Sequence, residues 1–292
     1  MTEAIETAGW SNAWPAPAKI NLMLRILDRR PDGYHNLQTV FQFIQQQDIL
    51  DFRVRTDGKI HRMPALPGVA EADDLTVRAA MLLQAATGTR LGADIRLDKR
   101  LPMGAGLGGG SSDAATVLVA LNYLWKSGLS RAELAALGVQ LGADVPVFVQ
   151  GKAAWAEGIG ERLQPIDLPE PYYLVLIPDC QVETAKIFAN QQLTRDASAI
   201  TICDFITGCQ ENHCLPTVKD LYLPVAAAYR WLQQVAEARL TGTGACVFAE
   251  FSEVMDAQRM LAQIPTTCRG FVTQGVNQSP LYERVAKEPI QA

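Results

Sequence analysis

A glycine-rich segment, residues 101–115, constrains the fold more than any other part of this sequence. Five glycines occupy seven consecutive positions, 104–110, and lead into Ser111, Ser112 and Asp113 at the start of an apolar helical segment. Backbone N–H groups can approach an anion closely where no Cβ intervenes, and the first N–H groups of a helix lack internal partners and lie at the positive end of its dipole. The segment therefore predicts a loop that holds a phosphate ester.

Two familiar nucleotide-binding loops differ from this segment. A Walker A loop ends in Gly-Lys-Ser/Thr, whereas Gly110 is followed by Ser111 and the loop contains no lysine. Residues 104–109 satisfy G-x-G-x-x-G, but a dinucleotide fold also needs a strand that ends in an acid about 20 residues later. Residues 129–141 favour a second helix instead. The remaining alternative is a turn that only connects a strand to a helix.

Length and composition exclude several classes of protein. The chain has 292 residues, which is enough for two domains, and its net charge of −5 argues against nucleic-acid binding, which needs a basic surface. No apolar run is long enough to cross a membrane, and the first 18 residues contain no Lys or Arg, so we expect neither a span nor a signal peptide. We expect a cytoplasmic protein, a monomer or weak homodimer, whose six cysteines are free thiols rather than metal ligands.

Hydrophobic periodicity predicts an antiparallel β layer followed by helices in the first half. Strands are expected at residues 22–26, 40–44 and 50–54, and a helix capped by Asp73 or Asp74 is expected to end near Gly88. A strand around residues 95–97 leads into the glycine loop. Helices follow at residues 114–125 and, after the capping box that Ser130 and Glu133 form, up to residue 142.

Three prolines between residues 165 and 171 mark the best candidate boundary, which divides the chain into residues 1–164 and 165–292. The second half contains predicted strands at 173–177, 245–251 and 270–273. Helices are expected at 225–238 and 256–263. Strands and helices that alternate in this way predict an α+β fold.

Lys19 and Asp144 are candidates for phosphoryl transfer, which requires bound phosphates, neutralised charge and an acceptor hydroxyl near a base. The Lys19 ammonium at the start of a strand can reach a phosphate or the reacting hydroxyl, but it is also explained as a solvated strand-end lysine. The Asp144 carboxylate can accept a hydroxyl proton, but it can also cap the turn that Pro146 begins. Spacing alone leaves the two roles of Lys19 equal, and it favours the turn cap for Asp144.

Two further groups suit a ligand site. Thr-Gly-Thr-Gly-Ala at 241–245 can bring backbone close to a ligand, or can serve only as the entry to a strand. Tyr34, His35 and Phe188 lie near predicted turns and can stack on a nucleobase, although packing is the better explanation for each of them taken singly.

Three segments together resemble the GHMP kinases. They are Pro-Ala-Pro-Ala-Lys-Ile-Asn at 15–21, the glycine loop at 102–112 with Asp-Ala-Ala after it, and the segment at 241–245. The resemblance spans nearly the whole chain. Asp-Gly-Tyr-His at 32–35 and the segments at 141–148 and 270–280 resemble signatures of the members of this family that act on a CDP-linked methylerythritol.

The resemblance implies a two-domain α+β fold with the active site between the domains. The N-terminal domain would be like domain 2 of ribosomal protein S5, and the C-terminal domain would be ferredoxin-like. The implied activity uses ATP and Mg²⁺ to phosphorylate the 2-hydroxyl of 4-(CDP)-2-C-methyl-D-erythritol, in the non-mevalonate route to isoprenoid precursors. Another small-molecule kinase of the family, or a non-catalytic ATP-binding protein of the same fold, remains an alternative.

The resemblance also implies roles for individual residues. Lys19 and Asp144 would be the catalytic pair. Asp74 stands where the family pattern has asparagine, which leaves its contact with adenine open, and residues 194–216 match nothing. The substrate would contact Asn21, Tyr34, His35, Thr184 and Phe188. ATP would contact Lys99 and the loop residues Pro102, Met103, Gly104, Ala105, Gly106, Leu107, Gly108, Gly109, Gly110, Ser111 and Ser112.

Overall fold

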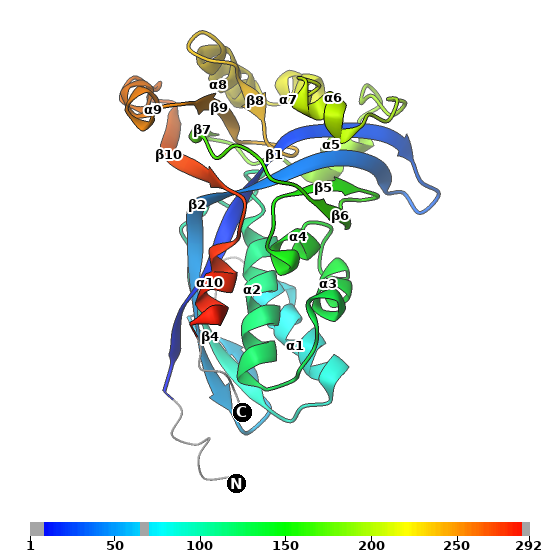
Figure 1. Cartoon of the computed structure of the whole chain (residues 1–292), viewed down its shortest axis with the longest axis vertical. Helices are drawn as coiled ribbons and strands as arrows, with labels where there is room; N and C mark the ends of the chain where they lie inside the picture. The colour runs from blue at the N-terminus through cyan, green and yellow to red at the C-terminus, as the bar shows by residue number, and fades with distance from the viewer. Residues whose placement is uncertain (1–8, 65–69, 288–292) are drawn as a thin grey trace.

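A long β-hairpin runs through the whole molecule (Figure 1). The computed structural model describes residues 9–64 and 70–287, so the first eight of the 18 residues that were expected not to be a signal peptide lie outside it. Strands β1 (Ser11–Arg29) and β2 (His35–Arg55) pair antiparallel, with bulges that bend the ribbon. The predicted strands at 22–26, 40–44 and 50–54 are confirmed as parts of these two longer strands.

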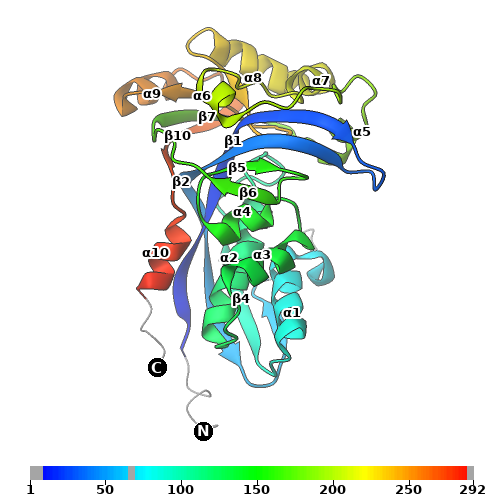
Figure 2. The same cartoon turned by 45° about the vertical axis from the view of Figure 1, so that its right-hand side comes forward.

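The N-terminal half packs helices against one face of this hairpin and its neighbours (Figures 1 and 2). Its buried core contains the aromatic side chains Trp14, Phe43, Phe52 and Phe148. The strands added here are β3 (Ile60–Arg62), β4 (Gly92–Asp98), β5 (Ala154–Glu157) and β6 (Arg162–Pro165). The helices are the 3₁₀ turn η1 (Glu71–Asp73), α1 (Leu75–Thr87), α2 (Gly109–Leu124), α3 (Arg131–Val139) and α4 (Val145–Gln150).

The C-terminal half is a smaller antiparallel sheet joined to the first. Its strand β10 pairs with both β2 and β7, so the strand order β3-β4-β2-β10-β7-β9-β8 is continuous, and the expected α+β fold is confirmed. The strands are β7 (Tyr172–Pro178), β8 (Arg239–Leu240), β9 (Val247–Phe251) and β10 (Cys268–Val276). The helices are α5 (Thr184–Ala189), α6 (Ile202–Ile206), α7 (Leu215–Leu221), α8 (Leu223–Gln233) and α9 (Val254–Leu261).

The last helix, α10 (Pro280–Ala286), returns to the N-terminal half, as Figure 1 shows. Leu281 is 1% exposed and belongs to the same buried cluster as Phe52. The Tyr282 hydroxyl donates to the carbonyl of Val149 at the end of α4. Residues near the C-terminus therefore complete the core of the first half, and the division at residues 164 and 165 stays a prediction.

The helices depart from the predictions at several points. Helix α2 begins at Gly109 rather than Ala114, because Gly108 adopts a left-handed φ of 72° and turns the chain into the helix directly. Helix α8 ends at Gln233 rather than at residue 238. Helix α4 was not predicted, because Val-Pro-Val-Phe-Val is apolar on every side and has no helical period.

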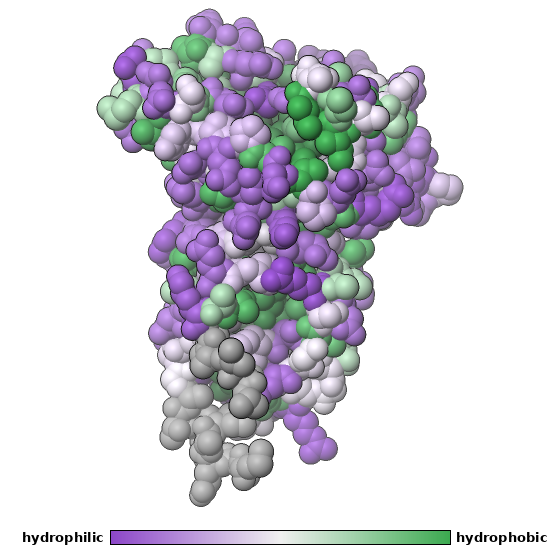
Figure 3. Space-filling model, viewed as in Figure 1, coloured by the Kyte–Doolittle hydropathy of each residue, from purple (hydrophilic) through white to green (hydrophobic). Residues whose placement is uncertain are grey.

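The face of the molecule shown in Figure 3 is mostly hydrophilic, and the cysteines, all of them in the described part of the chain, are not paired. A hydrophobic patch lies in the upper part of this face, in the region where Figure 1 draws α6. No helix within residues 9–64 and 70–287 has the length and apolar character to span a bilayer. All six cysteines are free thiols, and burial raises the pKa of Cys214 to about 12.

Candidate active site

A cavity of about 1100 Å³ lies where the two halves meet. The hairpin contributes its middle, around Lys19, and its tip, around Tyr34. The rest of the wall comes from the start of α1, the glycine loop, the residues before α4, helix α5 and the loop between β8 and β9. Segments far apart in the sequence therefore meet at one site.

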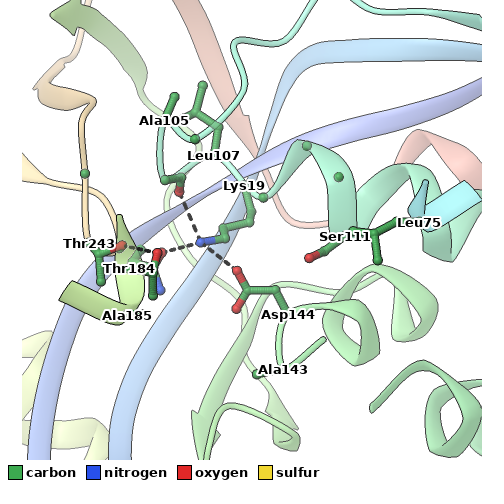
Figure 4. Close-up of a pocket in the computed structure, with 18 of the residues that line it drawn as sticks. Lys19, Leu75, Ala105, Leu107, Ser111, Ala143, Asp144, Thr184, Ala185 and Thr243 are labelled. Atoms are coloured by element: carbon green, nitrogen blue, oxygen red, sulfur yellow. Dashed lines mark hydrogen bonds and ion pairs between the residues drawn. The ribbon is translucent and has the colours of Figure 1, made fainter. Parts of the chain in front are cut away.

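Lys19 is buried at the centre of this cavity and points toward Asp144 (Figure 4). Its Nζ lies 3.1 Å from Asp144 Oδ2, and it donates to Asn21 Oδ1 at 2.5 Å and to the carbonyl of Gly106 at 3.1 Å. A buried ammonium requires such partners, because their oxygens replace the water that it has lost. The alternative of a solvated strand-end lysine is therefore wrong.

Asp144 is the N-cap residue of α4, but its side chain makes no capping hydrogen bond. The carboxylate pairs with Lys19 instead and is 34% exposed, while Lys19 is 3% exposed. The alternative that Asp144 caps the turn is therefore wrong. The pair presents an accessible carboxylate and a nearly inaccessible cation to the cavity.

The glycine loop packs closely against the second glycine-rich segment. Gly106 has a φ of 78°, and a Cβ there would lie 2.3 Å from the carbonyl oxygen of Thr241. The Thr241 hydroxyl donates to the carbonyl of Gly106 and accepts the backbone N–H of Asn21. Glycine is therefore required for this approach, and the segment at 241–245 supports the loop rather than only starting a strand.

A buried ion cluster underlies the start of the loop. Lys99 Nζ lies 2.6 Å from both Asp48 Oδ2 and Asp113 Oδ2, and Asp48 Oδ1 accepts the backbone N–H groups of Arg100 and Leu101. Burial raises the pKa of Asp113 to about 7, with Asp48 adding to the effect and Lys99 opposing it. Burial alone would lower the pKa of Lys99, but the two carboxylates outweigh it and raise that pKa.

Aromatic side chains gather at the other end of the cavity. The rings of His35 and Phe188 stack with centroids 5.0 Å apart and planes 28° from parallel. Tyr34 is 59% exposed beside them. The hydroxyls of Thr184 and Thr243 lie 2.8 Å apart nearby, which links α5 to the loop between β8 and β9. Burial lowers the pKa of His35, and the charges of neighbouring arginines lower it further.

The structure brings all but one of the predicted site residues to the cavity. The exception is Ser112, which does not line the cavity and is fully buried in α2. Asp74 caps α1, accepts two hydrogen bonds from Thr76 and pairs with Arg62, so its carboxylate is already engaged. Lining residues that the sequence did not single out as site residues include Arg29, Asp32, Gly33, Phe41, Thr76, Leu97, Asp113, Ala143, Ile159 and Ala185.

Most of these missed residues carried no distinguishing signal. Asp32 and Gly33 stood only within the segment 32–35 that carries the family resemblance and were given no role of their own, and Phe41 lay only in a predicted strand. Asp113 was recognisable as the first acid after the glycines, but Asp48, which shares Lys99 with it, lies 51 residues before Lys99. Proximity of that kind is not encoded in local spacing.

Two family models match the chain. The model for the N-terminal domain of GHMP kinases matches residues 74–152, and the model for the C-terminal domain matches residues 201–270. This chain belongs to the GHMP kinase family. The two matched regions contain the glycine loop with Asp144 and the segment at 241–245, so the sequence resemblance is confirmed.

Two close relatives of this GHMP kinase share one enzyme name within the family. A 4-diphosphocytidyl-2-C-methyl-D-erythritol kinase from Alkalilimnicola ehrlichii is 57% identical over 279 residues, which is 96% of each chain. An enzyme of the same name from Nitrosococcus oceani is 53% identical and covers 94% of this chain and 98% of its own. A crystal structure of 4-(cytidine 5'-diphospho)-2C-methyl-D-erythritol kinase superposes with a TM-score of 0.77 at 32% identity, covering 89% and 98% of the two chains. The chain is therefore a phosphotransferase.

Proposed function

We propose that this GHMP kinase transfers the γ-phosphate of ATP to the 2-hydroxyl of 4-(CDP)-2-C-methyl-D-erythritol, and so forms the 2-phosphate and ADP on the non-mevalonate route to isoprenoid precursors. The observation that carries the proposal is the buried Lys19–Asp144 pair between a glycine loop and an aromatic end of the same cavity. The names of the relatives support the choice of acceptor.

Lys19 and Asp144 are the proposed catalytic pair. The substrate oxygen forms a bond to the γ-phosphorus as the bond from that phosphorus to the β,γ-bridging oxygen breaks, and ADP leaves with the electron pair. The hydroxyl proton passes to the Asp144 carboxylate, which is the accessible member of the pair. Lys19 offsets negative charge at the reacting oxygens, and Asn21 and the carbonyl of Gly106 hold its ammonium in place.

The glycine loop and the start of α2 are the proposed phosphate site. Helix α2 has 16 residues and begins at Gly109, so its first N–H groups and its dipole favour an anion at the end of the loop. ATP carries Mg²⁺, a cation that prefers oxygen ligands, and the Ser111 hydroxyl and the Asp144 carboxylate fit it. Bound there, the ion would neutralise phosphate charge.

The aromatic end is the proposed nucleoside site. Tyr34 and Phe188 offer ring faces for a base, and His35 and Thr184 offer polar groups for its edge and for the attached chain. This end distinguishes a nucleotide-linked alcohol from the small alcohols that other kinases phosphorylate.

Incubation of the purified protein with ATP, Mg²⁺ and the CDP-alcohol tests the proposal. We expect one ADP for each substrate consumed and a new phosphate monoester in the ³¹P NMR spectrum. Transfer to homoserine, mevalonate or a sugar, but not to the CDP-alcohol, would favour another kinase of the family. Tight ATP binding without transfer to any acceptor would favour the non-catalytic alternative. The cytoplasmic location and the monomer or weak homodimer stay predictions, and sedimentation tests the latter.

A further inference from the structure

Arg195 contacts both His35 and Phe188 at the aromatic end of the cavity. It lies in the segment 194–216, to which the sequence assigned no function. Its Nε donates to His35 Nε2 at 3.2 Å. One terminal nitrogen donates to the carbonyls of Phe188 at 2.8 Å and Asn190 at 2.6 Å, and the other donates to the carbonyl of Leu193 at 3.1 Å. A single half-buried guanidinium therefore contacts both β2 and the end of α5.

The contact with His35 fixes the protonation of its ring. A guanidinium has N–H donors and no acceptor, so Nε2 of His35 must accept and the ring hydrogen must lie on Nδ1. A protonated imidazole would carry hydrogens on both nitrogens and would oppose one N–H to another. Burial, Arg195 and Arg29 lower the pKa of His35, and Asp28 opposes them. Arg195 thus selects the neutral ring and one of its two tautomers.

The contacts with α5 fix the position of Phe188. The last carbonyls of a helix lack partners within it, and cations are favoured at that end. Helix α5 ends at Ala189. The Arg195 guanidinium donates hydrogen bonds to the carbonyls of the residues on either side of it, Phe188 and Asn190. The Arg195 side chain therefore fixes the backbone of Phe188, whose ring stacks on the His35 ring that Arg195 also contacts.

We infer that Arg195 is a positioning residue for nucleoside recognition, which acts through His35 and Phe188 without lining the cavity itself. The inference rests on the proposed function, because it assigns the aromatic end to the nucleoside of the acceptor substrate. Since Arg195 contacts neither the glycine loop nor the Lys19–Asp144 pair in the described structure, its effect is confined to that substrate.

Steady-state kinetics test where Arg195 acts. We expect Arg195→Met to raise the KM for the CDP-alcohol about tenfold or more, with the KM for ATP and kcat changed less than about twofold, because hydrogen bonds from a charged donor are lost at one end only. Arg195→Lys keeps the charge but not the planar fork, and we expect an intermediate KM. Arg259→Met is the matched control, since Arg259 is exposed on α9 and pairs only with Asp256 among the described contacts. Equal rises in both KM values would overturn the inference.

A mutant cycle and NMR test the route through His35. The effect of Arg195→Met on the KM should be much smaller in a His35→Ala background. The chain has three histidines, so the ¹⁵N spectrum of His35 can be assigned by its loss in that variant. At pH 7 we expect a neutral ring with its hydrogen on Nδ1, and in Arg195→Met a mixture of tautomers and a higher pKa.

The two experiments separate the inference from the proposed function. The NMR measurement needs no substrate, so the tautomer is decided even if the protein fails to phosphorylate the CDP-alcohol. A wild-type His35 with its hydrogen on Nε2, or a tautomer unchanged by Arg195→Met, would overturn the inference whatever the activity. Failure of phosphoryl transfer with the expected tautomer would count against the proposed function alone.

Discussion

Lys19 and Asp144 differ in exposure, and this difference separates their proposed tasks. Lys19 is enclosed by three oxygen partners, so its ammonium is held in one place. Asp144 has one described ion-pair partner and an accessible carboxylate. A fixed cation beside a reachable carboxylate suits charge neutralisation and proton acceptance respectively.

Replacing Asp144 by asparagine tests its part in the reaction. We expect Asp144→Asn to lower kcat by roughly 10²–10⁴-fold, the range typical of a lost general base, because the amide retains the shape but cannot take the proton. The Kd for ATP, measured by calorimetry, should change less than about threefold. Equal losses in turnover and nucleotide affinity would instead mean that Asp144 is a structural residue.

Sequence reasoning could predict the residues that lie in compact motifs and missed those whose partners are distant in the chain. Lys19, Asp144 and the glycines stand in short patterns that together resemble the family, although each residue alone had a structural alternative. Asp48 lies in a polar stretch of β2 with no motif, and it reaches Lys99 only because β2 and β4 are neighbours. Arg195 follows no pattern and acquires its meaning from the fold alone.

The glycine loop between β4 and α2 tolerates side chains poorly at some positions. Gly104 and Gly106 can be compared directly, because their backbone conformations are similar. Gly104 and Gly106 both have positive φ, at 64° and 78°. A Cβ at Gly104 would meet only Gln181, at 3.9 Å, whereas one at Gly106 would lie 2.3 Å from the Thr241 carbonyl oxygen. The conformational cost of alanine is therefore similar at both positions, and the steric cost is not.

Gly106→Ala should impair the enzyme far more than Gly104→Ala. The alanine at 104 costs about 1–2 kcal/mol for its left-handed conformation, while the alanine at 106 must also separate the two loops. We expect the KM for ATP to rise more than about tenfold in Gly106→Ala and only a few fold in Gly104→Ala, with melting temperatures measured alongside. Similar kinetics in the two variants would contradict the close packing of the loops.

The ion cluster under the loop links β2, the end of β4 and α2, and it makes stability depend on pH. Burial raises the pKa of Asp113 to about 7 from an ordinary value of 3.8. The folded state then holds a proton that the unfolded state has released, so this contribution to stability is complete below about pH 4 and is lost as the pH rises through 7.

Asp113→Asn should remove this pH dependence, because the amide does not titrate. We expect the free energy of unfolding of the wild type, relative to Asp113→Asn, to fall between pH 5 and pH 8 in urea denaturation. Leu221→Ala, which changes no titrating group, provides the control and should keep a constant difference from the wild type. A difference between wild type and Asp113→Asn that is flat across this range would contradict the raised pKa.

Elements were predictable where an apolar period or a cap was clear. Helix α1 begins at the Asp74 cap, and the capping box at Ser130 and Glu133 starts α3 as expected. The full length of β2 was not predicted, because its polar residues 45–48 interrupt the alternation where the strand changes partners. Pairing with several neighbours is a property of the sheet and not of the segment.

At the scale of the molecule, the first half is completed by the last helix. Leu281 of α10 is fully enclosed by side chains of the N-terminal core. We expect Leu281→Ala to lower the free energy of unfolding by about 2–5 kcal/mol, the range for a buried leucine, as measured by urea denaturation. Leu221→Ala at the partly exposed end of α7 should cost less than about 1 kcal/mol. Equal costs would mean that α10 is only loosely attached.

The hairpin of β1 and β2 carries both ends of the proposed acceptor site. Lys19 and Asn21 lie in its middle, and Tyr34 and His35 lie at its tip. Under the proposed function, the separation between the reacting hydroxyl and the base would be set by the number of residues between those points, at about 3.3 Å for each residue. Two residues added to each strand would keep every side chain on its face and move the tip by about 7 Å. If the proposed site is correct, the length of the hairpin determines the length of the acceptor that fits, and a change in strand length would alter which alcohols bind.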